Sequence, residues 1–431
     1  MLVPIRADAV KNGTMSSPAT PRPTDPIATL PLTPGSPTGV EQPAECVHWT
    51  ESGTAHSARW RSESGFVAPE RVVVVDDTLT ADAAYRLVQK NTALLWRGDY
   101  HNARQLLQAL GRRLDRGRRG RDADLTQAFR RHRTEAERRA RLLGLLLVPL
   151  NADFGIPLRR APDVRAACAE TWGPAEETAG TPASDTASVT PLRELIGIVG
   201  AHEWRRTGVT VPVLGDRIHA HYGVFSPVRG EYLGLVADAP LPAVTTPHPE
   251  HSGLVAFDIG TGTGVIAAIL AHRGVGQVIG TDQSPRALAC AVENVARLGY
   301  ADRVTVQNAD LFPDGRAHLV VCNPPWIPAS AVTATDHAVY DPDSRMLRGF
   351  LQGLAEHLLP GGEGWLIISD IAERLGLRSR GTLLDLIDDA GLTVVTRHDT
   401  RPTHARARNT DDPLFAARSA EITSLWVLRA A

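Results

Sequence analysis

The sequence lacks several features that would assign a protein to a class at once. Its four cysteines, Cys46, Cys168, Cys290 and Cys322, are far apart and form no CxxC pair, which excludes a disulfide framework and a cysteine zinc site. We expect reduced, isolated thiols and no bound metal. No apolar run approaches the roughly 18 residues of a membrane span, and the first residues lack the apolar segment of a secretory signal. These absences favour a soluble, cytoplasmic protein without a membrane partner.

The composition divides the chain into three parts. With 431 residues and a hydrophobic fraction of 43%, the chain is long enough for two or three domains with a real core. Residues 1–45 are rich in Pro, Ser, Thr and Gly, which predicts a disordered tail. We expect a mainly helical N-terminal domain over residues 46–215, for substrate recognition or as a lid, and an α/β domain over residues 216–431.

Within the expected helical domain, apolar residues recur at helical spacing between residues 78 and 115. Thr80 is a plausible N-cap, and Gly98 interrupts the pattern between two helices. Residues 173–190 are small and polar, which predicts an exposed loop between two helical pieces. From residue 216 to 236 the pattern predicts a strand, a turn at Ser226-Pro227 and a second strand. We expect structural roles for His219 and His221, since no third metal ligand is near.

The segment from Arg112 to Arg141 has an unusual charge pattern, with twelve arginines and five acidic residues. Such a strip can contact nucleic-acid phosphates. The alternative is a solvated helix face whose arginines pair with Glu135, Glu137 and nearby aspartates. We favour the helix face, because no aromatic residues are interleaved with the charges.

From residue 254 onward, apolar strand patterns alternate with helical patterns. This alternation predicts a doubly wound, mostly parallel, seven-stranded sheet. Only a loop separates the last two strand candidates, so we expect an antiparallel pair at the sheet edge. The expected strands are LVAFDI, QVIGTD, VTVQNAD, HLVVCN, GWLIIS, LTVVTRH and SLWVLR.

A glycine-rich turn follows the first of these strands. It runs Asp258-x-Gly260-x-Gly262-x-Gly264 and opens a helix, as a turn that approaches a ligand closely requires. At the end of the next strand stands Asp282, whose carboxylate can accept both hydroxyls of a ribose. A structural turn is the simpler reading of the glycines alone, but the placement of the second acid favours a nucleotide-type cofactor.

These motifs resemble the class I S-adenosylmethionine-dependent methyltransferases, over roughly residues 216–431. The resemblance implies that the glycine loop, from Asp258 to Gly264, holds the methionine end of the cofactor. It also implies that Asp282 binds the ribose and that Asp310 bonds the adenine amine, with Leu311 against the ring. The GxGxG spacing differs from the dinucleotide GxGxxG pattern, which disfavours a nicotinamide dehydrogenase.

The strand HLVVC is followed by Asn323-Pro324-Pro325-Trp326 at the carboxyl edge of the expected sheet, where such folds place ligands. Asn323 and a carbonyl of the Pro324-Pro325 backbone can accept both N–H groups of a planar amine, and Trp326 can stack on it. The motif resembles the (N/D)PP(Y/F/W) pattern of amino-group methyltransferases that act on glutamine amides, adenine or guanine. Trp is the less usual fourth residue.

The sequence thus predicts an enzyme that transfers the methyl group of S-adenosylmethionine to a nitrogen by direct in-line displacement. A small-molecule or protein acceptor is favoured over nucleic acid. One alternative is a cyclase that converts the cofactor into azetidine-2-carboxylate and methylthioadenosine, and another is a non-catalytic module that binds nucleic acid or protein. Candidate lid or acceptor residues are Tyr222, Phe225, Asp341 and Arg345, with helix capping as the competing role for residues 343 and 344.

Overall fold

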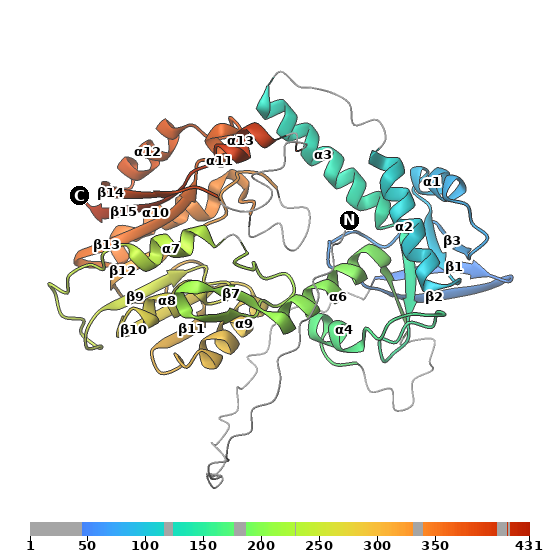
Figure 1. Cartoon of the computed structure of the whole chain (residues 1–431), viewed down its shortest axis with the longest axis horizontal. Helices are drawn as coiled ribbons and strands as arrows, with labels where there is room; N and C mark the ends of the chain where they lie inside the picture. Colours follow the sequence, from blue (N-terminus) through green and yellow to red (C-terminus); the bar gives the residue numbers. More distant parts are fainter. Residues whose placement is uncertain are drawn as a thin grey trace, which may run out of the picture. The chain divides into compact units, whose positions relative to one another are not determined.

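The computed structural model (Figure 1) describes residues 45–115, 124–175, 187–228, 230–330, 339–402, 412 and 414–431. The predicted tail 1–45, apart from its last residue, and residues 176–186 of the predicted loop lie outside this part of the chain.

The C-terminal region contains the predicted seven-stranded sheet, in the order β11-β10-β9-β12-β13-β15-β14. Five neighbouring strands run parallel, and β15 is antiparallel to both β13 and β14, so the predicted antiparallel pair at the edge is confirmed. In sheet order the strands are β11 (Val304–Asn308), β10 (Gln277–Asp282), β9 (Val255–Ile259), β12 (Ala317–Cys322), β13 (Leu358–Ser369), β15 (Thr423–Ala430) and β14 (Leu392–Thr400).

Helices cover both faces of this sheet (Figure 1), as the buried side chains of alternate strand residues require. One core joins the strands to α7 (Glu231–Asp238), α8 (Val265–His272) and α9 (Pro285–Arg297). The other joins them to α10 (Arg345–His357) and α12 (Arg380–Asp389). The short helices α11 (Ile371–Arg374) and α13 (Phe415–Ser419) follow β13 and precede β15. The doubly wound fold is thereby confirmed.

The N-terminal region differs from the prediction of a mainly helical domain, because its core is built on a six-stranded mixed sheet. In sheet order its strands are β1 (Cys46–Glu51), β2 (Thr54–Trp60), β6 (Ser188–Pro191), β5 (Leu146–Leu150), β4 (Ala93–Trp96) and β3 (Val72–Val75). Its helices are α1 (Ala81–Gln89), α2 (Tyr100–Asp115), α3 (Leu125–Leu143), α4 (Arg165–Trp172) and α6 (Leu192–Thr207). A two-stranded sheet, β7 (Val209–Val211) with β8 (Asp216–Ile218), follows.

Short interior strands explain this difference. The run Ala93–Trp96 pairs in parallel with strands on both sides and is buried throughout, so it shows no alternation that would distinguish it from a helix. Thr80 does cap α1 by accepting a hydrogen bond from the backbone N–H of Ala83. The second strand predicted near residue 232 is instead helix α7, which buries Tyr232, Leu233 and Val236 at helical spacing.

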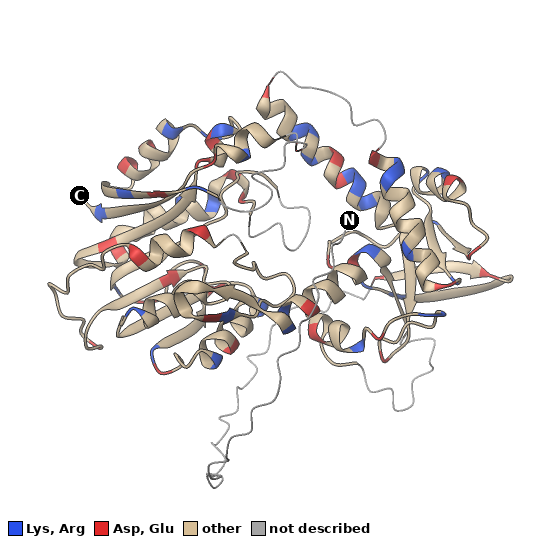
Figure 2. Ribbon diagram, viewed as in Figure 1, with Lys and Arg blue, Asp and Glu red and all other residues tan. Residues whose placement is uncertain are grey.

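The arginine-rich segment forms the end of α2 and most of α3, and Figure 2 shows both signs of charge along α3. Arg113 pairs with Asp82 and Arg139 pairs with Asp115, which supports the interpretation of a solvated, paired helix face. The arginines at positions 116, 118, 119 and 121 lie outside the described residues.

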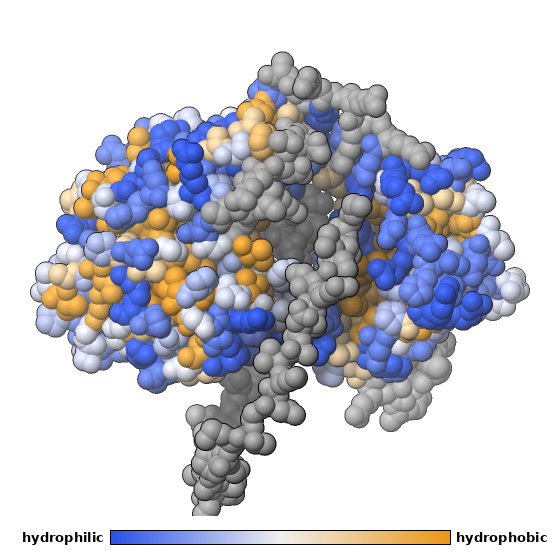
Figure 3. Space-filling model, in the orientation of Figure 1, coloured by the Kyte–Doolittle hydropathy of each residue, from blue (hydrophilic) through white to orange (hydrophobic). Residues whose placement is uncertain are grey.

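On the face shown in Figure 3, apolar residues are interspersed with hydrophilic ones. None of the helices that the structure describes is both long enough and apolar enough to cross a membrane.

Candidate functional site

A cavity of about 1160 Å³ opens at the carboxyl edge of the seven-stranded sheet. Residues that follow three adjacent parallel strands line it: Gly260 after β9, Asp282 at the end of β10 and Asn323 after β12. Ligand pockets usually measure about 300–1,000 Å³. The cavity therefore has room for a cofactor and for part of a second molecule.

The glycine loop is shaped by backbone that other residues rarely adopt. Gly260, Gly262 and Gly264 have φ angles of +71°, +56° and +77°. A Cβ on Gly260 would lie 2.5 Å from Cε of Met346, and one on Gly264 would lie 3.2 Å from Ala291. Gly260 and Gly262 line the cavity, whereas Gly264 is the N-cap residue of α8.

Asp258 lies beneath this loop rather than in the cavity wall, and it is 1% exposed. Its Oδ2 accepts hydrogen bonds from the Thr261 hydroxyl at 2.6 Å and from the Ala267 backbone N–H at 3.0 Å. Burial raises the pKa of Asp258 to about 6, although the two hydrogen bonds oppose the shift. Asp258 thus connects β9, the loop and α8 internally.

The two other predicted cofactor acids lie at the ends of neighbouring strands. Asp282 lines the cavity, and its Oδ2 accepts the Gly262 backbone N–H at 3.1 Å, which links β10 to the glycine loop. Asp310 is bonded to Gln283 and, at 2.7 Å, to Arg345. Leu311 lines the cavity with a φ of +76°.

S-adenosylmethionine, the cofactor implied by the resemblance, fits these residues. The glycines with positive φ carry backbone without side chains along the cavity wall, and Asp282 lines a cavity of sufficient volume. Gly260 and Gly262 would hold its amino-acid end, and Asp282 would accept hydrogen bonds from its ribose hydroxyls.

The Asn-Pro-Pro-Trp segment also lines the cavity. Oδ1 of Asn323 accepts a hydrogen bond from Nε1 of Trp326 at 2.9 Å. Burial raises the pKa of Tyr232, and a hydrogen bond with Asn323 opposes this shift in part. The amide oxygen of Asn323 is thus directed to Trp326, and its side chain also contacts Tyr232.

The other half of the cavity lies beyond Asn323. In sheet order β13 and β15 follow β12, and cavity-lining residues come from their ends: Ile371 after β13, and Arg418 and Glu421 before β15. Glu421 is 1% exposed and accepts a hydrogen bond from Ser369 at 2.7 Å. The predicted cofactor residues thus occupy one half of the edge, and a second group of polar residues occupies the other.

The candidate lid and acceptor residues differ in their positions. Phe225 and Arg345 line the cavity, with Arg345 on the side of Asp310. Tyr222 lies against Arg286, whose guanidinium carbon is 5.6 Å from the ring centroid. Asp341 accepts the backbone N–H groups of residues 346 and 347, so Asp341 makes the capping bonds at the start of α10. Burial raises the pKa of Asp341.

The sequence did not indicate several polar residues of the cavity, among them Tyr232, Glu421, Glu63 and Arg286. Arg286 follows Asp282 by four residues, at the start of the next helix, a position close to the motif in sequence. Glu63 and Glu421 are far from the motifs in the sequence, and no local pattern predicts that they line the cavity.

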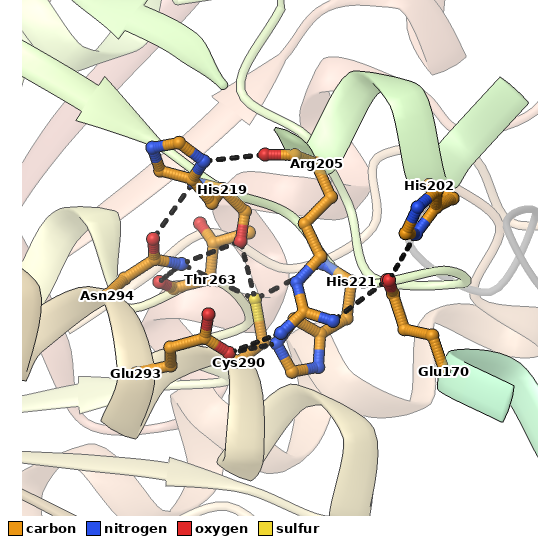
Figure 4. A network of polar contacts seen from close by, with 9 residues as sticks. All are labelled: Glu170, His202, Arg205, His219, His221, Thr263, Cys290, Glu293 and Asn294. Atoms are coloured by element: carbon orange, nitrogen blue, oxygen red, sulfur yellow. Dashed lines mark hydrogen bonds and ion pairs between the residues drawn. The ribbon is translucent and has the colours of Figure 1, made fainter. Parts of the chain in front are cut away.

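A polar network extends from the glycine loop to the N-terminal helices (Figure 4). Nδ2 of Asn294 in α9 donates to the carbonyl oxygens of Thr263 and His219, both at 3.1 Å. Glu293 accepts from Arg205 of α6 and lies 2.8 Å from Nε2 of His221. Both histidines of the 219–221 segment therefore make structural contacts, as expected.

The network continues into α4. Arg205 also pairs with Glu170 at 2.9 Å, and the same carboxylate bonds His202 at 2.7 Å. Burial opposes ionisation of Glu293, but its bonds to His221 and Arg205 outweigh burial and lower its pKa. Helix α9 is thereby bonded to both the cofactor loop and the N-terminal region.

Residues 217–376 match the family model described as the methyltransferase small domain. A release factor glutamine methyltransferase from Cereibacter sphaeroides is 35% identical over 175 residues, which are 35% of this chain and 60% of that relative. A ribosomal protein uL3 glutamine methyltransferase from Bordetella pertussis is 30% identical over 158 residues, covering 35% and 52%.

Among solved structures, a methyltransferase from Geobacter sulfurreducens in complex with S-adenosyl-L-homocysteine covers 52% of this chain and 99% of its own, with 18% identity and a TM-score of 0.32. The chain spans about half the length of the first curated relatives, with 60%, 51% and 41% of each covered. The family match does not include the region before residue 217. Residues 217–376 therefore belong to the methyltransferase small domain, and this part of the chain is a class I S-adenosylmethionine-dependent methyltransferase domain.

Proposed function

We propose that the protein transfers the methyl group of S-adenosylmethionine to a nitrogen atom held beside Asn323. One observation carries the proposal: a single cavity is lined by the glycine loop, by Asp282 and by the Asn-Pro-Pro-Trp segment. The order of these residues along three adjacent strand ends brings a cofactor site and an amide oxygen to the same space.

In this proposal S-adenosylmethionine, when bound, would supply an electrophilic methyl group and leave as S-adenosylhomocysteine, while the acceptor nitrogen loses one proton to solvent. Oδ1 of Asn323 accepts an N–H of the acceptor, and a carbonyl of the Pro324-Pro325 backbone accepts the second. These two bonds orient the nitrogen lone pair, so catalysis comes mainly from positioning. The bond from Nε1 of Trp326 to Oδ1 of Asn323, together with the contact from Tyr232, would hold the amide in the required orientation. Trp326 provides a flat apolar surface for the acceptor.

We infer a protein acceptor that presents a primary amide. The named relatives are glutamine methyltransferases of release factors and of ribosomal protein uL3. The half of the cavity beyond Asn323 contains the buried carboxylate of Glu421, a group that can accept N–H groups of an amide, beside Arg418. A small-molecule amide is the second candidate.

The test is mass spectrometry of products after incubation of the full chain with S-adenosylmethionine, with and without a glutamine-containing peptide. We expect a mass increase of one methyl group on the peptide. The Asn323→Ala variant should lose about 10²-fold or more of this activity, because orientation of the nucleophile is lost, and should retain cofactor binding.

Asn308→Ala is the matched control. Asn308 also ends a parallel strand, but it is exposed and does not line the cavity, so activity should be unchanged. Full activity in Asn323→Ala would refute the assigned role of the motif. Methylthioadenosine formed without any peptide would instead establish the cofactor cyclase, and failure to bind the cofactor would leave the non-catalytic module.

A further inference from the structure

A loop of the N-terminal region reaches the same cavity. Glu63, Ser64 and Gly65 line it together with Asp282 and Arg286. These loop residues lie far outside the matched span 217–376, so the family does not account for them. Nothing in the catalytic motifs requires a wall supplied by this part of the chain.

The loop is connected to α9 by an ion pair. Nη1 of Arg286 donates to Oε2 of Glu63 at 2.7 Å, and Nη2 of Arg286 donates to the carbonyl oxygen of Thr171 at 2.7 Å. Oε1 of Glu63 accepts from Nε1 of Trp172 at 2.8 Å. The two charged side chains are 15% and 36% exposed for Glu63 and Arg286, so water screens the pair only in part.

Residues of the N-terminal region also hold the loop in place. Glu194, which is 8% exposed, accepts the Ser62 hydroxyl at 3.0 Å and the Glu63 backbone N–H at 2.7 Å. Gly65 has a φ of +69°, a conformation that favours glycine. These bonds define one position for the loop instead of leaving it to move over the cavity.

The position of Arg286 shows which end of the cavity the loop reaches. Arg286 lies in the first turn of α9, four residues after Asp282, the residue expected at the ribose, and both line the cavity. Tyr222 packs against the guanidinium group, and burial raises the pKa of this tyrosine to about 12. The loop is therefore at the nucleoside end and not at Asn323.

We propose that residues 62–65 are part of the cofactor site, and that the Glu63–Arg286 pair positions them against the nucleoside end of S-adenosylmethionine. The proposal rests on the proposed function only in taking this molecule as the ligand. It gives the N-terminal region a role in cofactor binding, separate from any role in acceptor recognition.

The competing explanation is that the pair only holds two regions of the chain together. A second pair makes the comparison possible, because Glu293 of the same helix is bonded to Arg205 of α6 and does not line the cavity. Loss of that pair removes a contact between the same regions without touching the cavity wall.

The experiment is calorimetric titration of the full chain with S-adenosylhomocysteine and, separately, with methylthioadenosine, which retains the nucleoside half. Variants are Glu63→Gln, Arg286→Met, the double variant and Glu293→Gln as control. We expect each single variant to bind both ligands about tenfold more weakly than wild type, because the loop loses its position. The double variant should bind no more weakly than the weaker-binding of the two single variants. The control should bind within about twofold of wild type.

Equal affinities in wild type and the single variants, with circular dichroism showing native folding, would overturn the proposal. So would an effect of Glu293→Gln as large as that of Arg286→Met, or independent, multiplying losses in the double variant. Absence of any binding by the wild-type chain would instead remove the proposed function, and the inference with it.

Discussion

The amide of Asn323 is contacted by two aromatic residues, Trp326 and Tyr232. Tyr232 is buried, and its side chain shares a hydrogen bond with Asn323. Tyr232→Phe removes one hydroxyl and preserves the ring. We expect kcat for methyl transfer to fall about tenfold, the equivalent of one hydrogen bond, while cofactor affinity stays the same.

Tyr100→Phe is the matched control, because Tyr100 is equally buried at 3% but lies in the core of the N-terminal region. Steady-state kinetics with a methyl acceptor and calorimetry with S-adenosylhomocysteine provide the two measurements. A kcat for Tyr232→Phe within twofold of wild type would show that Asn323 is oriented without the tyrosine.

Some residues of the candidate site can be predicted from the sequence, and others cannot. Gly260, Asp282 and Asn323 are predictable because each follows a strand, and parallel strand ends meet at one edge. Glu63 and Glu421 are not, because only the folded chain brings them to that edge. Their positions depend on tertiary packing, which a short local pattern does not encode.

Among the elements, the turn from β9 to α8 depends on one buried acid. Asp258 holds Thr261 and Ala267, and burial raises its pKa from 3.8 to about 6. The folded state therefore binds the proton more tightly than the unfolded state. The contribution to stability is fully present below pH 3.8 and is lost as pH rises through about 6.

We expect Asp258→Asn to remove this pH dependence, since the amide oxygen can still accept both hydrogen bonds. The unfolding free energy of wild type minus that of the variant should fall by on the order of 3 kcal/mol between pH 4 and pH 7.5. Urea unfolding across this range measures it. Asp302→Asn is the control, because the Asp302 side chain is 75% exposed. Parallel profiles for wild type and Asp258→Asn would contradict the assignment.

Elements with a clear period were predictable, and fully buried short ones were not. The alternation of apolar strand patterns with helical patterns after residue 254 predicted all seven strands of the second sheet. In the N-terminal region β4 and β5 are buried on both faces, so their apolar runs do not alternate. These segments form strands because they pair with strands that are distant in the sequence, and a local sequence pattern does not predict such pairing.

At the scale of the whole molecule, residues Ala44–Ala431 form one unit by their contacts. The arginine-rich helix α3 contributes to this unity through its apolar side. Phe129 is 4% exposed and clusters with Ile371, Leu375 and Leu414 of the C-terminal region. On the same helix Arg133 lies 3.9 Å from the ring centroid of Tyr340, a residue of the cavity wall. Helix α3 thus packs behind the half of the cavity that lies beyond Asn323.

Phe129→Ala should therefore destabilise the full chain by about 3–5 kcal/mol, the range for a buried phenylalanine. Since the lost contacts join two regions, we also expect scanning calorimetry to resolve two unfolding transitions where wild type shows one. S-adenosylhomocysteine should raise only the transition of the region with the glycine loop, because a ligand stabilises what it binds. Leu384→Ala, at a side chain 43% exposed, should leave one transition with stability nearly unchanged. A single destabilised transition in Phe129→Ala would mean that the remaining contacts, including Glu63–Arg286, suffice to couple the two regions.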